Sequence, residues 1–179
     1  MKKLFTLLAL TISFSMNAQI STNGTSNSGA DASAMGKSTT ASGDRSTAIG
    51  AWSNASASYS FAGGRSTTAS GYGSSALGRD NTSSGTYSGA LIGRFNLSSG
   101  EYSSASGRGT TASGNNSSTM GYYTIASDYA SVVIGQYNSS GSSVTNNATA
   151  FNTANTAFVI GNGADSSNKS DAFKVMFNG

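Results

Sequence analysis

Apolar and polar positions repeat with a fixed period between residues 33 and 135. A glycine recurs at intervals of 14 residues, with one interval of 15, and the two residues before it are mostly one small and one large apolar residue. In a strand, two such neighbours point to opposite faces. The glycines, which we interpret as structural turn residues, are Gly36, Gly50, Gly64, Gly78, Gly93, Gly107, Gly121 and Gly135. Self-similarity at a fixed period predicts a solenoid.

The columns of equivalent residues keep their character along the chain. The large column contains Met35, Ile49, Gly63, Leu77, Ile92, Ser106, Met120 and Ile134, and the small column contains Ala34, Ala48, Ala62, Ala76, Leu91, Ala105, Thr119 and Val133. A second strand is centred on Ala41, Ala55, Ala69, Ser83, Ser98, Ala112 and Ala126, and a second turn follows two residues later. Two strands and two turns in each 14-residue coil predict an all-β fold, a parallel β-roll or β-solenoid.

The apolar content of each coil bears on assembly. One or two large apolar side chains per coil contribute about 2 to 5 kcal/mol if they are buried. Ordering the backbone costs about 1 to 2 kcal/mol for each residue, and hydrogen bonds between coils offset only part of that cost. A single thin roll is therefore weakly stabilised. We expect a homo-oligomer, with the face of the second strand as the interface.

Several segments resemble a known repeat. Ser46-Thr47-Ala48-Ile49-Gly50, Ser74-Ser75-Ala76-Leu77-Gly78 and Ser131-Val132-Val133-Ile134-Gly135 are similar to the core of YadA-like head repeats, as are Thr40-Ala41-Ser42-Gly43 and Thr68-Ala69-Ser70-Gly71. These repeats belong to trimeric autotransporter adhesins. The resemblance implies a left-handed roll, a homotrimer, and a head that binds extracellular matrix, cell-surface proteins or glycans on host or neighbouring cells. Similar rolls occur in phage tail fibres and other secreted fibres.

The chain divides into four segments. Residues 1–18 are interpreted as a signal peptide, because Lys2 and Lys3 precede an apolar run and Ala18 suits cleavage. That run is too short to span a membrane, so no transmembrane segment is expected in the mature chain. Residues 19–30 are a polar lead-in, 31–138 the head repeats, and 139–179 a transition or collar with a last coil and a terminal strand. At the junction of the head repeats and the collar, residues 138–156 suit either a protruding loop or the exit from the head.

The net charge of the chain says little about its partners, but the basic residues are concentrated in one column of the repeat. Without Lys2 and Lys3, eight of the ten basic residues remain, against seven acidic ones, which predicts no specific nucleic-acid binding. The residue after the glycine is basic in five coils, and aromatic residues lie at neighbouring turn positions. The candidate binding residues are Lys37, Arg65, Arg79, Arg94, Arg108, Trp52, Tyr59, Phe95, Tyr123 and Tyr137. These residues suit a surface that binds an anionic or glycan ligand. They suit equally a solvent-exposed column that keeps the protein soluble, in which the basic residues pair with acidic residues and the aromatic rings pack over turns or between chains.

Catalytic chemistry has little support. The chain contains no histidine and no cysteine, which excludes Ser-His and Cys-His nucleophiles and imidazole or thiolate metal sites. We therefore predict no enzyme, no cofactor and no metal. The predicted function is a secreted or cell-surface adhesin-like head. The alternatives are a structural segment of a tail or envelope fibre, and an ice-binding solenoid, which the repeated Thr-x-Ser on one strand face suggests.

Overall fold

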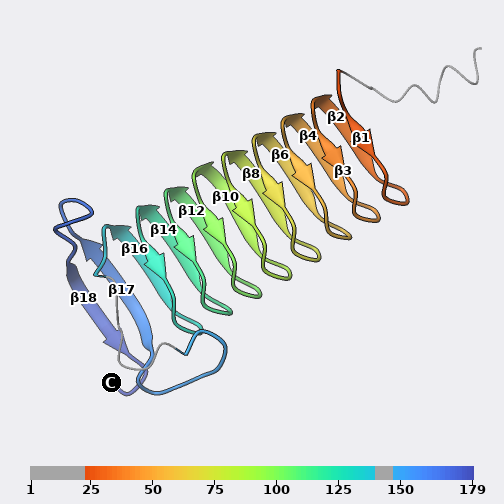
Figure 1. The fold of residues 1–179 in the computed structure, drawn as a ribbon. Coiled ribbons are helices and arrows are strands. Elements are labelled where there is room, and N and C mark those ends of the chain that lie inside the picture. Colours follow the sequence, from red (N-terminus) through yellow and green to blue (C-terminus); the bar gives the residue numbers. More distant parts are fainter. Residues whose placement is uncertain (1–22, 140–146) are drawn as a thin grey trace, which may run out of the picture.

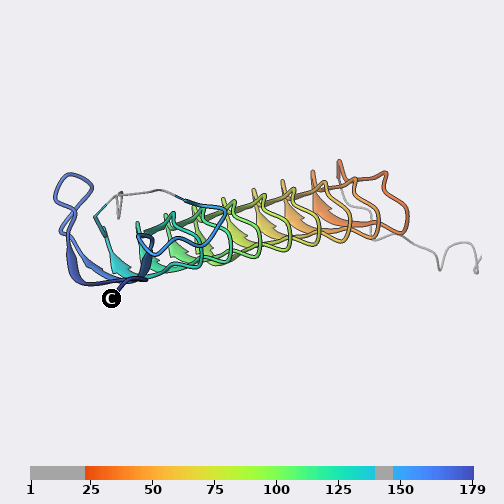
Figure 2. The same ribbon diagram turned by 90° about the horizontal axis from the view of Figure 1, so that it is seen from below.

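The structure is a computed structural model that describes residues 23–139 and 147–179, and this part of the chain contains strands and turns but no helix. The strands stack one behind another into an elongated roll (Figure 1). Turned by 90°, the same roll is thin, because each coil is flattened between two sheets (Figure 2). The predicted all-β parallel solenoid with 14-residue coils is confirmed. The predicted signal peptide lies outside the described residues.

Each coil contributes one long and one short strand, and the two kinds form separate sheets. The ten-stranded sheet, called the long sheet here, contains β2 (Ser33–Lys37), β4 (Thr47–Ala51), β6 (Phe61–Arg65), β8 (Ser75–Arg79), β10 (Gly89–Arg94), β12 (Ser104–Arg108), β14 (Ser118–Tyr122), β16 (Val132–Gln136), β17 (Thr156–Asn162) and β18 (Asp171–Met176). The eight-stranded short sheet contains β1 (Ser26–Asn27), β3 (Thr40–Ala41), β5 (Asn54–Ala55), β7 (Thr68–Ala69), β9 (Thr82–Ser83), β11 (Leu97–Ser98), β13 (Thr111–Ala112) and β15 (Ile125–Ala126).

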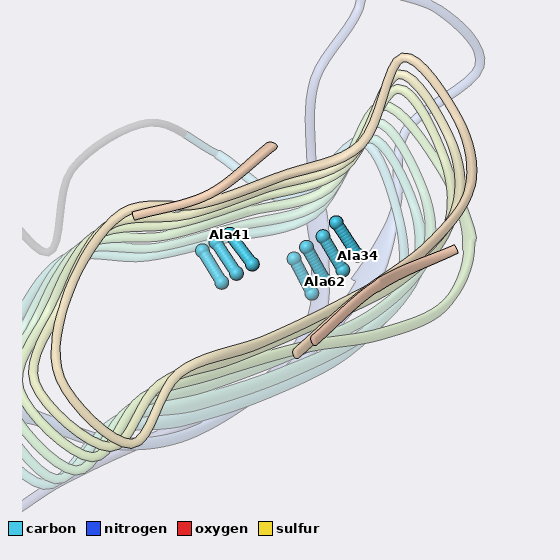
Figure 3. Packing of buried hydrophobic residues seen from close by; sticks show 7 residues of the cluster. Ala34, Ala41 and Ala62 are labelled. Carbon is cyan, nitrogen blue, oxygen red and sulfur yellow. The ribbon is translucent and has the colours of Figure 1, made fainter. Parts of the chain in front are cut away.

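The core of the roll is built from alanine. Ala34, Ala48, Ala62 and Ala76 of the long sheet face Ala41, Ala55 and Ala69 of the short sheet, and all seven are buried (Figure 3). Methyl groups from the two sheets fill the interior, so the sheets approach closely. Towards the C-terminal end the same place is taken by Ala126, Val133 and Val159. The small columns of the sequence are therefore the inward-facing ones.

The large apolar column lies on the opposite, outward face of the long sheet. Ile49, Leu77 and Ile134 are only half-buried there, and Met120 is 59% exposed. A Cβ atom built on Gly63 would come within 2.7 Å of Leu77 and 3.3 Å of Phe61, so these two side chains cover the glycine from outside the roll. The burial expected for the large side chains therefore does not occur within one chain, because an interior that alanine fills has no room for them.

In the 15-residue coil, the assignment of Leu91 to the small column and of Ile92 to the large column is wrong. Ala90, not Leu91, pairs with Ala76 and Ala105 in the buried column, and Leu91 takes the outward position opposite Ser106. Ile92 is the additional residue, a bulge that is 75% exposed with a φ of 45°. The short sheet keeps its parallel register through the same coil, because β11 pairs with both β9 and β13 without a shift.

A buried polar column lies at the third residue after each glycine. It contains Thr39, Ser53, Thr67, Asn81, Asn96, Thr110, Thr124 and Asn138, each at most 5% exposed. The Asn96 amide N–H donates to Asn81 Oδ1 at 2.8 Å, and Thr110 Oγ1 donates to Asn96 Oδ1 at 2.8 Å. From Ser53 to Thr110, and again at Asn138, these side chains bond to a neighbouring coil, whereas the buried Thr39 Oγ1 has no hydrogen-bond partner among the described residues.

The two ends of the roll differ. At the N-terminal end, β1 already pairs with β3, so the first short strand lies within the predicted lead-in. At the other end, Asn138 bonds the backbone of Ile125 through both its Oδ1 (2.7 Å) and its Nδ2 (3.0 Å), as a further strand would. β17 adds a last parallel strand after β16, and β18 closes the sheet in antiparallel orientation. Of the segment interpreted as loop or exit, residues 140–146 lie outside the described residues.

Candidate functional site

The two bends of each coil stack into two edges that run along opposite sides of the flattened roll (Figure 3). At both bends one residue per coil has a positive φ, for example Trp52 at 55° and Tyr59 at 60°. The Trp52 amide donates to Lys37 O of the preceding coil at 2.8 Å, and the Tyr59 amide donates to Asp44 O at 2.8 Å. These bonds fix the bends in every coil, and the side chains there point into solvent, where large rings are accommodated.

The basic edge follows the long strands. Over the described coils it carries Lys37, Trp52, Arg65, Arg79, Asp80, Arg94, Phe95, Arg108, Tyr122, Tyr123 and Tyr137. Nine of the ten candidate binding residues lie on this edge. The basic side chains outnumber the one carboxylate, Asp80, among these residues five to one.

Cations and rings interleave along the basic edge. Lys37 Nζ and the Arg65 guanidinium lie 5.2 Å and 5.5 Å from the centroid of Trp52, so this ring is shared by two cations from the coils on either side of it. Arg94 lies 4.2 Å from the centroid of Phe95, and Arg108 lies 5.2 Å from that of Tyr122. A cation over an aromatic face at these distances is attracted to it.

The remaining charges and rings of this edge contact one another as well. Asp80 Oδ2 lies 3.2 Å from Arg79 Nε and 3.7 Å from Arg94 Nε. Tyr123 and Tyr137 are stacked with centroids 5.2 Å apart, and Tyr122 meets both rings edge-on. A hydrogen bond with Tyr122 and partial loss of solvent raise the pKa of Tyr137 above its ordinary value of 10.0.

The tyrosine edge precedes the long strands. It carries Asp31, Asp44, Arg45, Tyr59, Tyr72, Tyr87, Glu101, Tyr102 and Tyr129. The rings of Tyr59, Tyr72, Tyr87 and Tyr102 form a continuous ladder with successive centroids 5.4, 5.4 and 5.5 Å apart, and each of these four rings is 45–55% exposed. Partial desolvation in the ladder and the neighbouring Tyr87 and Tyr59 raise the pKa of Tyr72 above 10.0.

Arg45 lies at the start of this ladder. Its guanidinium lies 5.4 Å from the centroid of Tyr59 and donates a hydrogen bond to the Tyr59 hydroxyl, and its Nε lies 3.9 Å from Asp31 Oδ2. Within the described coils, the tyrosine edge therefore carries three carboxylates against one guanidinium. The two edges have opposite charge.

The structure separates one candidate residue from the others. Tyr59 lies on the tyrosine edge, whereas Trp52, which contacts Arg65, lies at the other bend. Tyr72 comes one residue earlier in its coil than Tyr59, Tyr87 and Tyr102, so a count of equivalent positions does not group it with them. An aromatic residue at either of the two central positions of this bend is the sequence signal that identifies the whole ladder.

In the described part of the chain, no group of three histidine, cysteine, aspartate or glutamate side chains is placed to hold a metal ion. Among the same residues there is also no helix long and apolar enough to cross a membrane.

The alanine core, the glycine-anchored coils and the two side-chain edges define a stacked parallel β-solenoid that presents repeated surfaces. The family model for the YadA head domain repeat matches residues 28–51, 41–67, 69–90 and 98–124. The chain therefore belongs to the YadA head family, whose members are structural domains of adhesins at the cell surface. A comparison with curated proteins gave no match.

Proposed function

We propose that this protein is the non-enzymatic head of a secreted or cell-surface adhesin, that it assembles as a homotrimer, and that it attaches to host cells, matrix or neighbouring cells. Membership of the YadA head family supports the adhesin class. Export rests on the interpretation of residues 1–18 as a signal peptide. Trimerisation rests on the surface described next.

The outward face of the long sheet is the observation that carries the proposal. Its two outward columns, from β2 to β17, contain no charged residue in the described chain, and Phe61, Leu77, Met120, Val132 and Ile134 lie among them. Met120 and Val132 are 59% and 38% exposed in the single chain. This uncharged face carries a large apolar side chain on every strand from β2 to β17 except β12, where Ser104 and Ser106 take both outward positions. Exposed apolar side chains gathered on one face of a monomer mark an interaction surface.

This face replaces the interface expected from the sequence. The outward positions of the short sheet are mainly threonine and serine, so packing them together buries little apolar surface. The alanine core itself stabilises each coil only weakly, since a buried methyl-sized group contributes about 0.8 kcal/mol. Packing three long sheets about a common axis removes the large side chains from water and adds the burial of apolar surface that the thin interior of one chain lacks.

The mass of the purified protein in solution tests the assembly. Sedimentation is expected to give three chains, and Leu77→Asp with Ile134→Asp is expected to give smaller species with the strand signal in circular dichroism retained. The matched control, Thr82→Asp on the outward face of the short sheet, is expected to remain trimeric. A folded monomer at micromolar concentration refutes the proposed trimer.

Attachment is tested separately. The labelled protein, free in solution, is expected to be retained by immobilised matrix proteins, glycans or cells more strongly than the dissociated Leu77→Asp, Ile134→Asp variant, because three linked copies bind with avidity. A trimer that is retained by none of these surfaces contradicts the adhesive function and favours the structural segment of a fibre.

One observation favours a second candidate, ice binding. The short sheet keeps an unbroken register over its eight strands, and its outward face, with Thr40, Thr68, Thr82 and Thr111, is no longer needed for oligomer contact. Asn54, Leu97 and Ile125 interrupt the threonines. A thermal-hysteresis measurement tests this candidate, and absence of hysteresis excludes it.

A further inference from the structure

The proposed trimer gives each edge of the roll a neighbour. The long sheet lies between the two bends, with the basic edge at one end of its strands and the tyrosine edge at the other (Figure 3). When flattened copies turn their long sheets to one axis and close into a ring, the contact is head-to-tail. The basic edge of each copy then lies beside the tyrosine edge of the next copy.

We propose that these two edges bind one another, so that the partner of the basic edge is a second copy of this chain rather than a free ligand. The inference rests on the proposed trimer and adds to it the contact that closes the ring. Five basic side chains and one carboxylate on the first edge meet three carboxylates and one guanidinium on the second, within the described coils. Opposite potentials across an interface favour the correct partner and orientation.

The two charged runs also match in extent. The charges of the basic edge begin at Lys37 and end at Arg108, and those of the tyrosine edge begin at Asp31 and end at Glu101. The two charged runs are therefore offset by six residues at one end and seven at the other, at most half a coil. Beyond these limits both edges become uncharged: tyrosines follow on the first, and Asn115 and Asn116 follow on the second.

The order of residues along the axis brings specific groups to the same level. Lys37 follows β2, so its level lies between Asp31, which precedes β2, and Asp44, which precedes β4. By the same count Glu101, which precedes β12, lies between the levels of Arg94 and Arg108. The lysine and two of the arginines therefore meet carboxylates.

Arg65 and Arg79 meet the tyrosine ladder instead. Arg79 follows β8 and lies between the levels of Tyr72 and Tyr87, and Arg65 lies between those of Tyr59 and Tyr72. These rings remain 45–51% exposed in the single chain, which leaves area for a guanidinium. The same chemistry already operates within the chain, where cations lie 4.2–5.5 Å from ring centroids. In the contact between copies, the guanidinium groups of one chain lie against the tyrosine rings of the next chain in the same way.

Cysteine cross-linking of the full chain tests this arrangement, because the sequence contains no native cysteine. Ser66→Cys places a thiol on the basic edge just after β6, and Ser58→Cys places one on the tyrosine edge just before β6. The double variant is expected to give covalent trimers under oxidation on a denaturing gel. Each single variant is expected to give none, because a head-to-tail contact does not bring a residue beside its own copy.

The matched control pairs Ser66→Cys with Ser70→Cys, which lies next to β7 on the outward side of the short sheet, and is expected to give no covalent trimer. Cross-linking of either single variant indicates like-with-like contact and overturns the inference. A double variant that sediments as three chains but does not cross-link overturns the inference and leaves the trimer standing. A monomeric protein overturns both.

Charge reversal provides a second, independent measurement. Arg94→Glu with Arg108→Glu is expected to raise the dissociation constant of the assembly about tenfold or more, and Glu101→Arg is expected to do likewise. Combining all three substitutions restores opposite charges and is expected to recover most of the affinity. Lys174→Glu, on β18 and outside both edges, is the control. If the combined variant instead raises the dissociation constant by the product of the separate fold-increases, the two edges do not meet.

Discussion

Substitution of Gly64 by alanine tests how the coils are held together. Gly64 has a φ of +122°, a conformation that side chains other than glycine rarely adopt. A Cβ atom at this position would lie 1.9 Å from Gly78 O in the next coil. The coil spacing is fixed by parallel hydrogen bonds, so neither strand moves aside without losing pairing.

The size of the effect follows from these two features. The backbone strain of a non-glycine residue at such a φ is about 1 to 3 kcal/mol. The Cβ contact must open by more than about 1 Å, and each ladder hydrogen bond lost in doing so costs about 1 kcal/mol. We expect Gly64→Ala to lower the free energy of unfolding by about 3 to 5 kcal/mol. For a chain of this length that corresponds to a melting temperature lower by about 6 to 20 °C.

Gly71→Ala is the matched comparison. A Cβ atom there would lie 2.0 Å from Gly85 O, nearly as close as at Gly64, but the φ of Gly71 is not positive. Its column naturally holds Ala57, so the backbone at this turn adjusts to a methyl group. We expect a loss of about 1 to 2 kcal/mol, since the conformational strain is absent.

Thermal and denaturant unfolding of both variants, followed by circular dichroism at one protein concentration, measures the difference. The concentration must be fixed because an assembling protein is stabilised by mass action. Equal losses in the two variants would refute the reasoning, because the backbone conformation of the anchor glycine would then contribute nothing beyond the space it leaves.

Three other predictions concern the bends and the bulge. The raised pKa of Tyr72 means that its neutral form is favoured in the folded protein, so this contribution to stability is complete below pH 10.0 and is lost as the pH rises through the folded value; Tyr72→Phe is expected to show a smaller fall in melting temperature between pH 9 and 11. Ser66→Gly removes a left-handed residue, with a φ of 53°, from a column that already tolerates Gly109, and is expected to raise stability by about 1 kcal/mol in urea unfolding. Deletion of Ile92 makes its coil 14 residues long and removes a β-branched residue with positive φ, so the melting temperature is expected to rise, whereas a fall would show that the bulge is required.

Much of the fold was accessible from the sequence because its signals are strictly local. The anchor glycines are required by a close approach and a φ that no other residue satisfies, so they repeat without exception from Gly36 to Gly135. Where the two sheets meet, a small residue is required, and it is alanine in most coils, with Ser83, Ser98 and Thr119 in others. Each of these constraints leaves a column of one dominant residue type, which can be recognised in the sequence alone.

The features that the sequence analysis missed arise where a constraint admits several residue types. The buried polar column alternates among threonine, serine and asparagine, since any of them can bond to the next coil, and it therefore carries no single-residue signal. Leu91 and Ile92 were misplaced because counting back from Gly93 cannot show on which side the additional residue lies. The shared position of Trp52 between Lys37 and Arg65 depends on neighbours one coil away in space.

The ladders between coils have a mechanical consequence. Their hydrogen bonds point along the axis of the roll, so a pull between the two ends of the chain loads one coil after another in series. Each coil occupies about 4.8 Å of the axis when closed and releases up to about 45 Å of chain when it opens. A head built in this way yields in discrete steps under tension and dissipates energy at each step, while the coils that stay closed keep their surfaces intact.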